Sequence, residues 1–179
     1  MVPFVWSEGQ TAVRAVTAAQ TPALHAAFLE CSDAAAVDPT FAEVPESEIA
    51  ELVQRSAAED SQERGFRMRG IHVGTAGELA GYFHLMEDVP AAGDVWLSIL
   101  AIRPQFRRSG IGTTVVAGLK RELAAGGFRF ALARVYLANV PALRFWMQQG
   151  FTEVVPHRGD YVGSDLGKPC IVLRTTLGR

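Results

Sequence analysis

One short segment combines residue types that could hold an anion. In "RRSGIG", Arg107 and Arg108 are followed by Gly110 and Gly112, where an apolar, helix-like pattern begins. A helix N-terminus presents unpaired N–H groups and a partial positive charge. Glycine lets a phosphate approach the main chain, and arginine adds bidentate contacts. The segment therefore predicts a pyrophosphate site, although a plain strand-to-helix turn with two solvated arginines would also fit these residues.

Two familiar phosphate-binding patterns do not describe this segment. A Walker A loop is excluded because no Gly-Lys-Ser/Thr sequence follows the glycines. A dinucleotide-binding fingerprint is disfavoured because the third glycine is absent and the preceding strand comes late in the chain. The expected site is therefore a different kind of main-chain anion cradle.

A buried strand and an amphipathic helix are expected to position the segment. Residues 95–102 form a nearly continuous apolar run rich in β-formers, which is typical of a strand covered on both faces. Pro104 ends this strand. Residues 110–125 predict a helix because apolar residues recur every four positions, and Gly126-Gly127 stops it.

The remaining periodicities predict one α+β domain over residues 1–179, because no linker divides the chain. The other expected strands cover residues 11–17, 66–73, 78–86, 129–137, 151–155 and 170–175. Two other helices are expected to begin near Thr21 and near Pro45, and a third is expected to cover residues 139–149. The predicted order is β-α-α-β-β-β-α-β-α-β-β, with a mixed sheet.

Composition excludes several classes of function. A net charge of −2 gives no electrostatic reason to expect nucleic acid or an anionic membrane as a partner. The longest apolar run, residues 95–102, is far shorter than the ~20 residues of a membrane helix. The N-terminus lacks a secretory pattern, so we expect a cytoplasmic protein. Cys31 and Cys170 have no metal-ligand spacing, so we expect two reduced, packed thiols and no metal site.

Two stretches together resemble the GNAT family of N-acetyltransferases. "VWLSILAIRPQFRRSGIG" is similar to motif A of that family, in which an apolar strand, a proline-containing turn and Arg/Gln-x-x-Gly-x-Gly/Ala follow one another. "VYLANVPALRFWMQQGFTEV" is similar to motif B, whose characteristic residues here are Asn139, Ala142, Phe145-Trp146 and Gly150-Phe151. The resemblance is specific over residues 95–155.

The resemblance implies a fold and a cofactor. The GNAT fold has a mixed central sheet of about seven strands flanked by about four helices. Two strands splay apart, and acetyl-CoA lies in the gap, with its pantetheine arm paired to a strand edge. Asn139 would contact that arm, or cap its helix. The implied cofactor-binding residues are Leu100, Ala101, Ile102, Arg107, Arg108, Ser109, Gly110, Ile111, Gly112, Thr113 and Asn139.

The implied reaction is direct attack of an amine on the acetyl thioester. At neutral pH roughly one alkyl amine in a few thousand is unprotonated, so a base helps. The family often places a tyrosine as acid in the motif B helix, but Trp146 stands here, and an indole cannot deliver a proton. His84 and Asp94 are the candidate catalytic residues. A half-buried strand histidine and a solvated loop acid are the alternatives.

The acceptor is expected to be a small-molecule or protein amine. Carboxylates in and after the first two helices would suit a cationic acceptor, although they would equally suit a solvated surface; they are Glu30, Asp33, Asp38, Glu43 and Glu46. Trp146 also supports an alternative function, a catalytically inactive acyl-CoA-binding sensor module. The resemblance leaves a homodimer open, with the late strands as its edge. Acceptor identity, acyl-chain length and oligomeric state are not fixed by the sequence.

Overall fold

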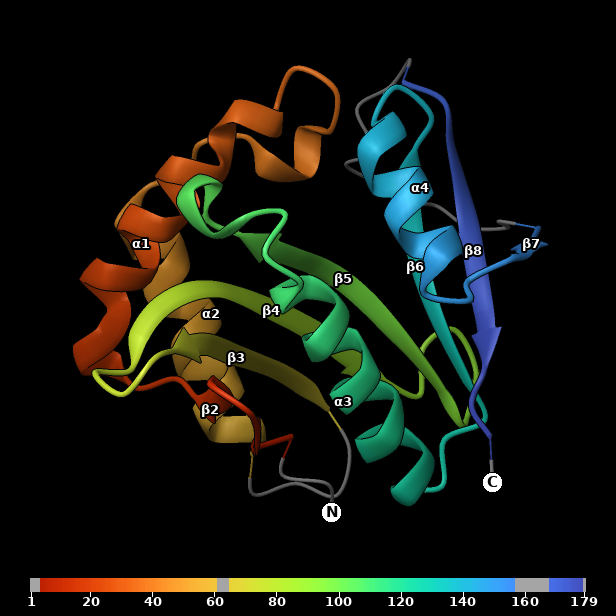
Figure 1. Ribbon diagram of the computed structural model, residues 1–179, viewed down its shortest axis with the longest axis horizontal. Coiled ribbons are helices and arrows are strands. Elements are labelled where there is room, and N and C mark those ends of the chain that lie inside the picture. The colour runs from red at the N-terminus through yellow and green to blue at the C-terminus, as the bar shows by residue number, and fades with distance from the viewer. Residues whose placement is uncertain (1–3, 61–64, 157–167, 179) are drawn as a thin grey trace.

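The computed structural model describes residues 4–60, 65–156 and 168–178. Its strands form one open sheet in the order β1-β2-β3-β4-β5-β6-β8-β7 (Figure 1). Only the β5–β6 pair is parallel, and all other neighbours are antiparallel. The strands are β1 Trp6–Glu8, β2 Thr11–Ala15, β3 Phe66–Val73, β4 Glu78–Glu87, β5 Asp94–Ile102, β6 Phe130–Tyr136, β7 Glu153–Val155 and β8 Cys170–Thr176.

Four α-helices accompany the sheet in the described residues, as the sequence predicts. They are α1 Thr21–Glu30, α2 Glu46–Glu59, α3 Ile111–Ala125 and α4 Val140–Gln148. Short 3-10 turns are η1 Ala18–Gln20, η2 Cys31–Ala34, η3 Pro39–Phe41 and η4 Pro104–Phe106. The α+β prediction is confirmed, and the eight strands exceed the expected seven by the short β1.

The helices cover the two faces of the sheet and create two cores. On one face, α1 and α2 pack against β3 and β4 around Leu24, Ile49 and Met68. On the other face, α3 packs against β1, β2 and β5 around a larger core that includes Val115 and Leu119. The sheet therefore separates the α1–α2 layer from the α3 layer.

A β-bulge in β5 changes which way its side chains point. His84 pairs with Ile99 and Leu85 pairs with Leu97, so Ser98 is an extra residue between them. Leu97 belongs to the α3 core, whereas Ile99, two residues on, belongs to the α1–α2 core. Regular alternation would have placed both side chains on one face. The bulge therefore divides β5 into two halves with opposite orientation.

No helix among the residues that the structure describes has both the length and the apolar character needed to cross a membrane.

Candidate functional site

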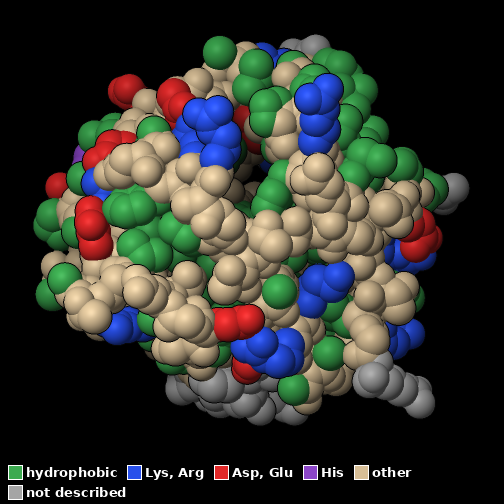
Figure 2. Space-filling view, viewed as in Figure 1, with side chains coloured by type: hydrophobic (Ala, Val, Ile, Leu, Met, Phe, Trp, Pro, Cys, Tyr) green, Lys and Arg blue, Asp and Glu red, His purple; other side chains and the backbone are tan. Residues whose placement is uncertain are grey.

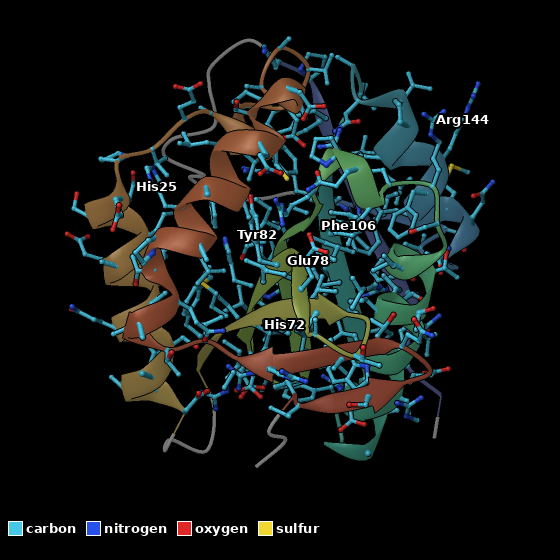
Figure 3. The ribbon with its side chains drawn as sticks, turned by 60° about the vertical axis from the view of Figure 1, so that its left-hand side comes forward. His25, His72, Glu78, Tyr82, Phe106 and Arg144 are labelled. Carbon is cyan, nitrogen blue, oxygen red and sulfur yellow. The ribbon has the colours of Figure 1, made fainter. Side chains whose placement is uncertain are left out.

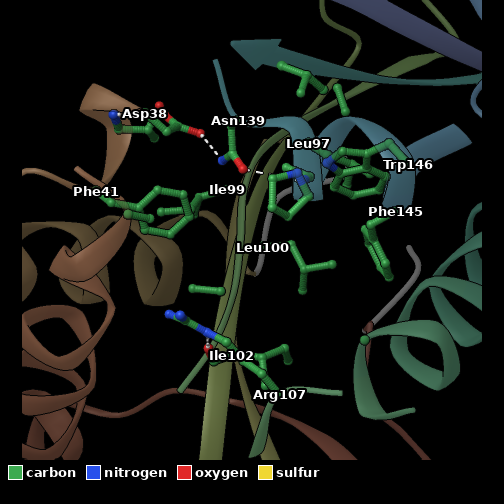
Figure 4. A pocket seen from close by; sticks show the side chains of 18 of the residues that line it. Asp38, Phe41, Leu97, Ile99, Leu100, Ile102, Arg107, Asn139, Phe145 and Trp146 are labelled. Atoms are coloured by element: carbon green, nitrogen blue, oxygen red, sulfur yellow. Dashed lines mark hydrogen bonds between the residues drawn. The ribbon is translucent and has the colours of Figure 1, made fainter. Parts of the chain in front are cut away.

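The two parallel strands β5 and β6 separate partway along their length. Their pairing runs from Asp94–Phe130 to Leu97–Ala133 and goes no further, although β5 continues to Ile102. The separation begins beside the bulge at Ser98. A cavity of about 690 Å³ occupies this opening (Figure 4). Figure 2 shows the surface hollowed between the segment that follows α1 and the helix α4.

Four parts of the chain line the cavity. They are the second half of β5, the η4–α3 turn, the facing end of β6 with α4, and the segment of residues 33–41 that follows α1. The cavity therefore unites elements that are far apart in sequence. Of the implied cofactor-binding residues, it is lined by Leu100, Ala101, Ile102, Arg107, Arg108, Gly110, Gly112, Thr113 and Asn139.

The N-terminus of α3 presents its main chain to the cavity. Gly110 precedes the helix with φ +86°, and no side chain caps the helix. Thr114 is the first residue whose N–H bonds back into the helix, to the Gly110 carbonyl, so the preceding amides have no helical acceptor. A Cβ at Gly110 would meet no atom within 4 Å, whereas one at Gly112 would lie 3.3 Å from the Phe145 ring. The amides are therefore accessible, and α3 approaches α4 closely.

The two arginines of the turn have different environments. The Arg107 guanidinium pairs with both carboxylate oxygens of Asp33, and its Nε donates to the Ile102 carbonyl at 2.8 Å. This hydrogen-bonded pair lowers the pKa of Asp33 and raises that of Arg107. Arg108 also lines the cavity and forms no ion pair with another described residue. Arg107 therefore joins η2 to the turn, while Arg108 is the arginine of the turn that is available to an anion.

Asn139 joins the motif B helix to the segment that follows α1. Its Oδ1 accepts from the Ala142 N–H at 3.2 Å and caps α4. Its Nδ2 donates to Asp38 Oδ2 at 3.3 Å (Figure 4). Both side chains are buried and both line the cavity. The capping role is therefore present, and the same residue also faces the cavity.

Neither candidate catalytic side chain lines this cavity. His84 lies on β4, with its ring 5.3 Å from that of Phe66; its Nδ1 is buried and has no hydrogen-bond partner in the described residues. Burial, with a smaller effect of Arg55, lowers the pKa of His84 to about 4. Asp94 lies at the paired end of β5 and lines a separate cavity of about 350 Å³. Burial raises the pKa of Asp94.

Some aromatic side chains line the cavity, and others pack in the core. Trp146 lines the cavity, packed edge-on against Phe145 at 5.3 Å and Phe151 at 4.8 Å. Tyr82 lies between α1 and the sheet, stacked on Phe28 at 3.9 Å (Figure 3). Its hydroxyl is buried without a hydrogen-bond partner among the described residues, and burial raises its pKa. Phe145 also lines the cavity, so both aromatic side chains of motif B contribute to its wall.

Sequence patterns alone missed part of the lining. Val37, Thr40 and Phe41 enter from the segment between α1 and α2, and residues 133–135 enter from β6. The β6 residues could have been found from the strand–helix–strand order around α3. Two strands joined by a helix can pair in parallel, which makes β5 and β6 neighbours. No local pattern marks Val37, Thr40 or Phe41.

Comparisons with known proteins agree with this geometry. The sequence model described as "Acetyltransferase (GNAT) family" matches residues 23–151. Among curated proteins, no match is found. A crystal structure of an acetyltransferase from Thermus thermophilus is 25% identical, with a TM-score of 0.70 over 94% of this chain and 98% of that one.

Two further solved structures contain coenzyme A. A PaiA N-acetyltransferase from Thermoplasma acidophilum, in complex with coenzyme A, is 14% identical, with a TM-score of 0.69 over 94% of this chain and 99% of that one. RimL, a ribosomal L7/L12 alpha-N-protein acetyltransferase in complex with coenzyme A, is 16% identical, with a TM-score of 0.77 over 97% and 98% of the two chains. At these identities the likeness concerns the fold.

Proposed function

Because the chain belongs to the acetyltransferase (GNAT) family, we propose that it transfers an acetyl group from acetyl-CoA to an amine by direct attack. The observation that carries this proposal is the opening between β5 and β6, with the N-terminus of α3 at its edge. An anion-binding helix end beside a strand edge without a partner suits a long ligand with a phosphate at one end and amides along its arm.

The residues present fit coenzyme A. The amides that precede Thr114, the open space over Gly110 and the cation of Arg108 suit a pyrophosphate. The edge of β5 beyond Leu97 has no strand partner on the β6 side, so its main chain suits the pantetheine arm. Asn139 lies beside the same path. Acetyl-CoA would supply the thioester that the amine attacks.

The chain's own residues would bind and orient the reactants. The acceptor would first lose its ammonium proton to water; its nitrogen would then bond to the acetyl carbon while the carbon–sulfur bond breaks. Coenzyme A would leave as its thiolate, and the nitrogen would release a second proton to water. Leu100, Phe145 and Trp146 form apolar walls along this path. The Trp146 indole can donate a hydrogen bond to the leaving sulfur but cannot supply a proton. This mechanism assigns no role to His84 or Asp94, because neither side chain lines the cavity.

One observation favours a second function, a catalytically inactive coenzyme A-binding module. Trp146 replaces the family's usual tyrosine, and neither candidate acid–base residue lines the cavity. Turnover separates the two functions. With acetyl-CoA and a panel of primary amines, an enzyme releases one free thiol for each acetylated amine. Tight binding of coenzyme A with no amine-dependent thiol release over the panel would instead support the module.

A further inference from the structure

Asp38 is a buried carboxylate that lines the cavity. Its side chain is 7% exposed. Oδ1 accepts from the Thr40 N–H at 3.0 Å, and Oδ2 accepts from Asn139 Nδ2 at 3.3 Å. In the part of the chain that the structure describes, no arginine, lysine or histidine forms an ion pair with it. The Asp38 carboxylate therefore accepts hydrogen bonds from two neutral groups, whereas a buried charge is normally paired with an opposite charge.

Other acidic side chains near the site do have such cations. Glu30 forms a bidentate pair with Arg103, with both N–O distances at 2.8 Å. Asp33 is paired with Arg107, as described above. A carboxylate can accept about four hydrogen bonds, and Asp38 uses two. Asp38 therefore has unused acceptor capacity at the wall of the cavity.

The position of Asp38 matches the reacting end of the cavity. The anion-binding turn lies at the Ile102 end of β5, where Arg107 bonds to the Ile102 carbonyl. Figure 4 places Asp38 and Asn139 at the other end of the opening, near Ile99 and Leu97. The strands separate just beyond Leu97. A donor whose phosphates lie against α3 would therefore carry its acyl group toward Asp38.

The surroundings of Asp38 restrict what else the acceptor can present. Phe41, Val37 and Ile99 line the cavity beside it. Arg134 also lines the cavity, with its guanidinium 5.3 Å from the Tyr136 ring. An acidic acceptor placed beside Asp38 would bring two like charges together. An apolar group next to an ammonium would complement both the walls and the carboxylate.

We propose that Asp38 is the specificity-determining residue of the acceptor site and selects a primary alkylammonium carried on an apolar group. This proposal rests on the proposed acetyltransferase function and names the acceptor class of the same site. Asp38 accepts a charge-assisted hydrogen bond from the ammonium, which fixes the nitrogen beside the acyl end of the donor. Asn139, bonded to both α4 and Asp38, holds that carboxylate in place and is a positioning residue.

The test uses two ligands that differ in one group. 2-Phenylethylamine carries an ammonium at neutral pH, and 2-phenylethanol carries a neutral hydroxyl on the same apolar frame. Each is titrated calorimetrically into wild-type protein saturated with coenzyme A. A charge-assisted hydrogen bond predicts that the amine binds about 10-fold to 100-fold more tightly than the alcohol. A ratio below about 3-fold, or no binding of the amine, overturns the proposal.

Two variants then test whether Asp38 causes the difference in affinity between the amine and the alcohol. Asp38→Asn and Asp38→Ser remove the charge, and both side chains can still accept from the Thr40 N–H. We expect the ratio to fall to about 3-fold or less in each, with unchanged affinity for coenzyme A. The control is Glu43→Gln, which removes an exposed carboxylate from the same inter-helix region and should leave the ratio unchanged. A ratio retained in a folded Asp38 variant overturns the assignment, whereas failure of the wild type to bind coenzyme A would refute the proposed function instead.

Discussion

The contact between α3 and β1 predicts that Gly118→Ala lowers the free energy of unfolding. Gly118→Ala adds a single Cβ in the middle of α3, where an exposed site would gain about 1 kcal/mol from helix propensity. Here that Cβ would lie 2.7 Å from Cε2 and 3.0 Å from Cδ1 of Trp6, and closer still to Nε1. Carbon atoms in contact prefer about 3.5–4 Å, so the indole has to move by roughly 1 Å.

The cost follows from how tightly Trp6 is held. It is 9% exposed, belongs to the α3 core, and lies 6.2 Å from the Phe83 ring. Overpacking of this kind costs about 1–3 kcal/mol, and expulsion of a core tryptophan costs about 3–5 kcal/mol. After the gain in propensity, we expect a net loss of about 2 kcal/mol in the free energy of unfolding, with an upper limit of about 4 kcal/mol.

Urea unfolding of a double-mutant cycle measures this directly. In a Trp6→Leu background the clash is gone, so Gly118→Ala should become stabilising by up to about 1 kcal/mol. The two effects of Gly118→Ala should therefore differ by about 3 kcal/mol and have opposite signs. Equal effects of Gly118→Ala in both backgrounds would refute the packing of α3 on Trp6.

Three further predictions concern buried and cavity-lining groups. Arg67 Nη2 lies 2.9 Å from Glu87 Oε2, and both side chains are 1% exposed. Glu87→Gln should therefore lower the free energy of unfolding, measured with urea, by about 3–5 kcal/mol. A loss below about 1 kcal/mol would argue against a buried ion pair. His84 has a folded-state pKa of about 4, below the unfolded value, so its contribution to stability is complete above pH 6.5 and is lost as the pH falls toward 4. His84→Gln should reduce the loss of stability between pH 7 and pH 5, and an unchanged pH dependence would contradict the shift. Trp146→Phe keeps the apolar wall but removes the N–H, so coenzyme A affinity should hold while the rate of thiol release falls about 10-fold; equal rates would exclude a role for the indole donor.

Local patterns in the sequence were sufficient for most of the elements. The apolar run 95–102 and the period of residues 110–125 correspond to β5 and α3, because a buried strand and a helix face leave clear periodicities. The three-residue strand Trp6–Glu8 was missed, since so short a strand shows no alternation to detect. The bulge at Ser98 was also missed, because it depends on the register with β4 and not on the residues of β5 alone.

The candidate site was predictable where one segment forms it. Gly110 and the turn before α3 lie at the cavity, and the pyrophosphate site expected there stays a prediction. Long-range pairs were not predictable, because Arg107 meets Asp33 across 74 positions and Asn139 meets Asp38 across 101. Arg107 matched a family signature, yet its guanidinium binds a carboxylate in this structure. His84 and Asp94 precede the turn in sequence, and neither side chain is among those that line the cavity.

Calorimetric titration with coenzyme A of the wild type, Gly110→Glu and Gly127→Glu tests the cofactor site most directly. Gly110 and Gly127 flank opposite ends of α3, have φ values of +86° and +79°, and have open space where a Cβ would lie. The backbone strain of the two substitutions is therefore matched, and only Gly110→Glu brings a carboxylate to the cavity. We predict micromolar binding, about −8 kcal/mol, for the wild type and Gly127→Glu, and binding at least about 100-fold weaker for Gly110→Glu. Equal affinities of the two variants, or no binding by folded wild type at millimolar coenzyme A, would contradict a pyrophosphate site at the N-terminus of α3.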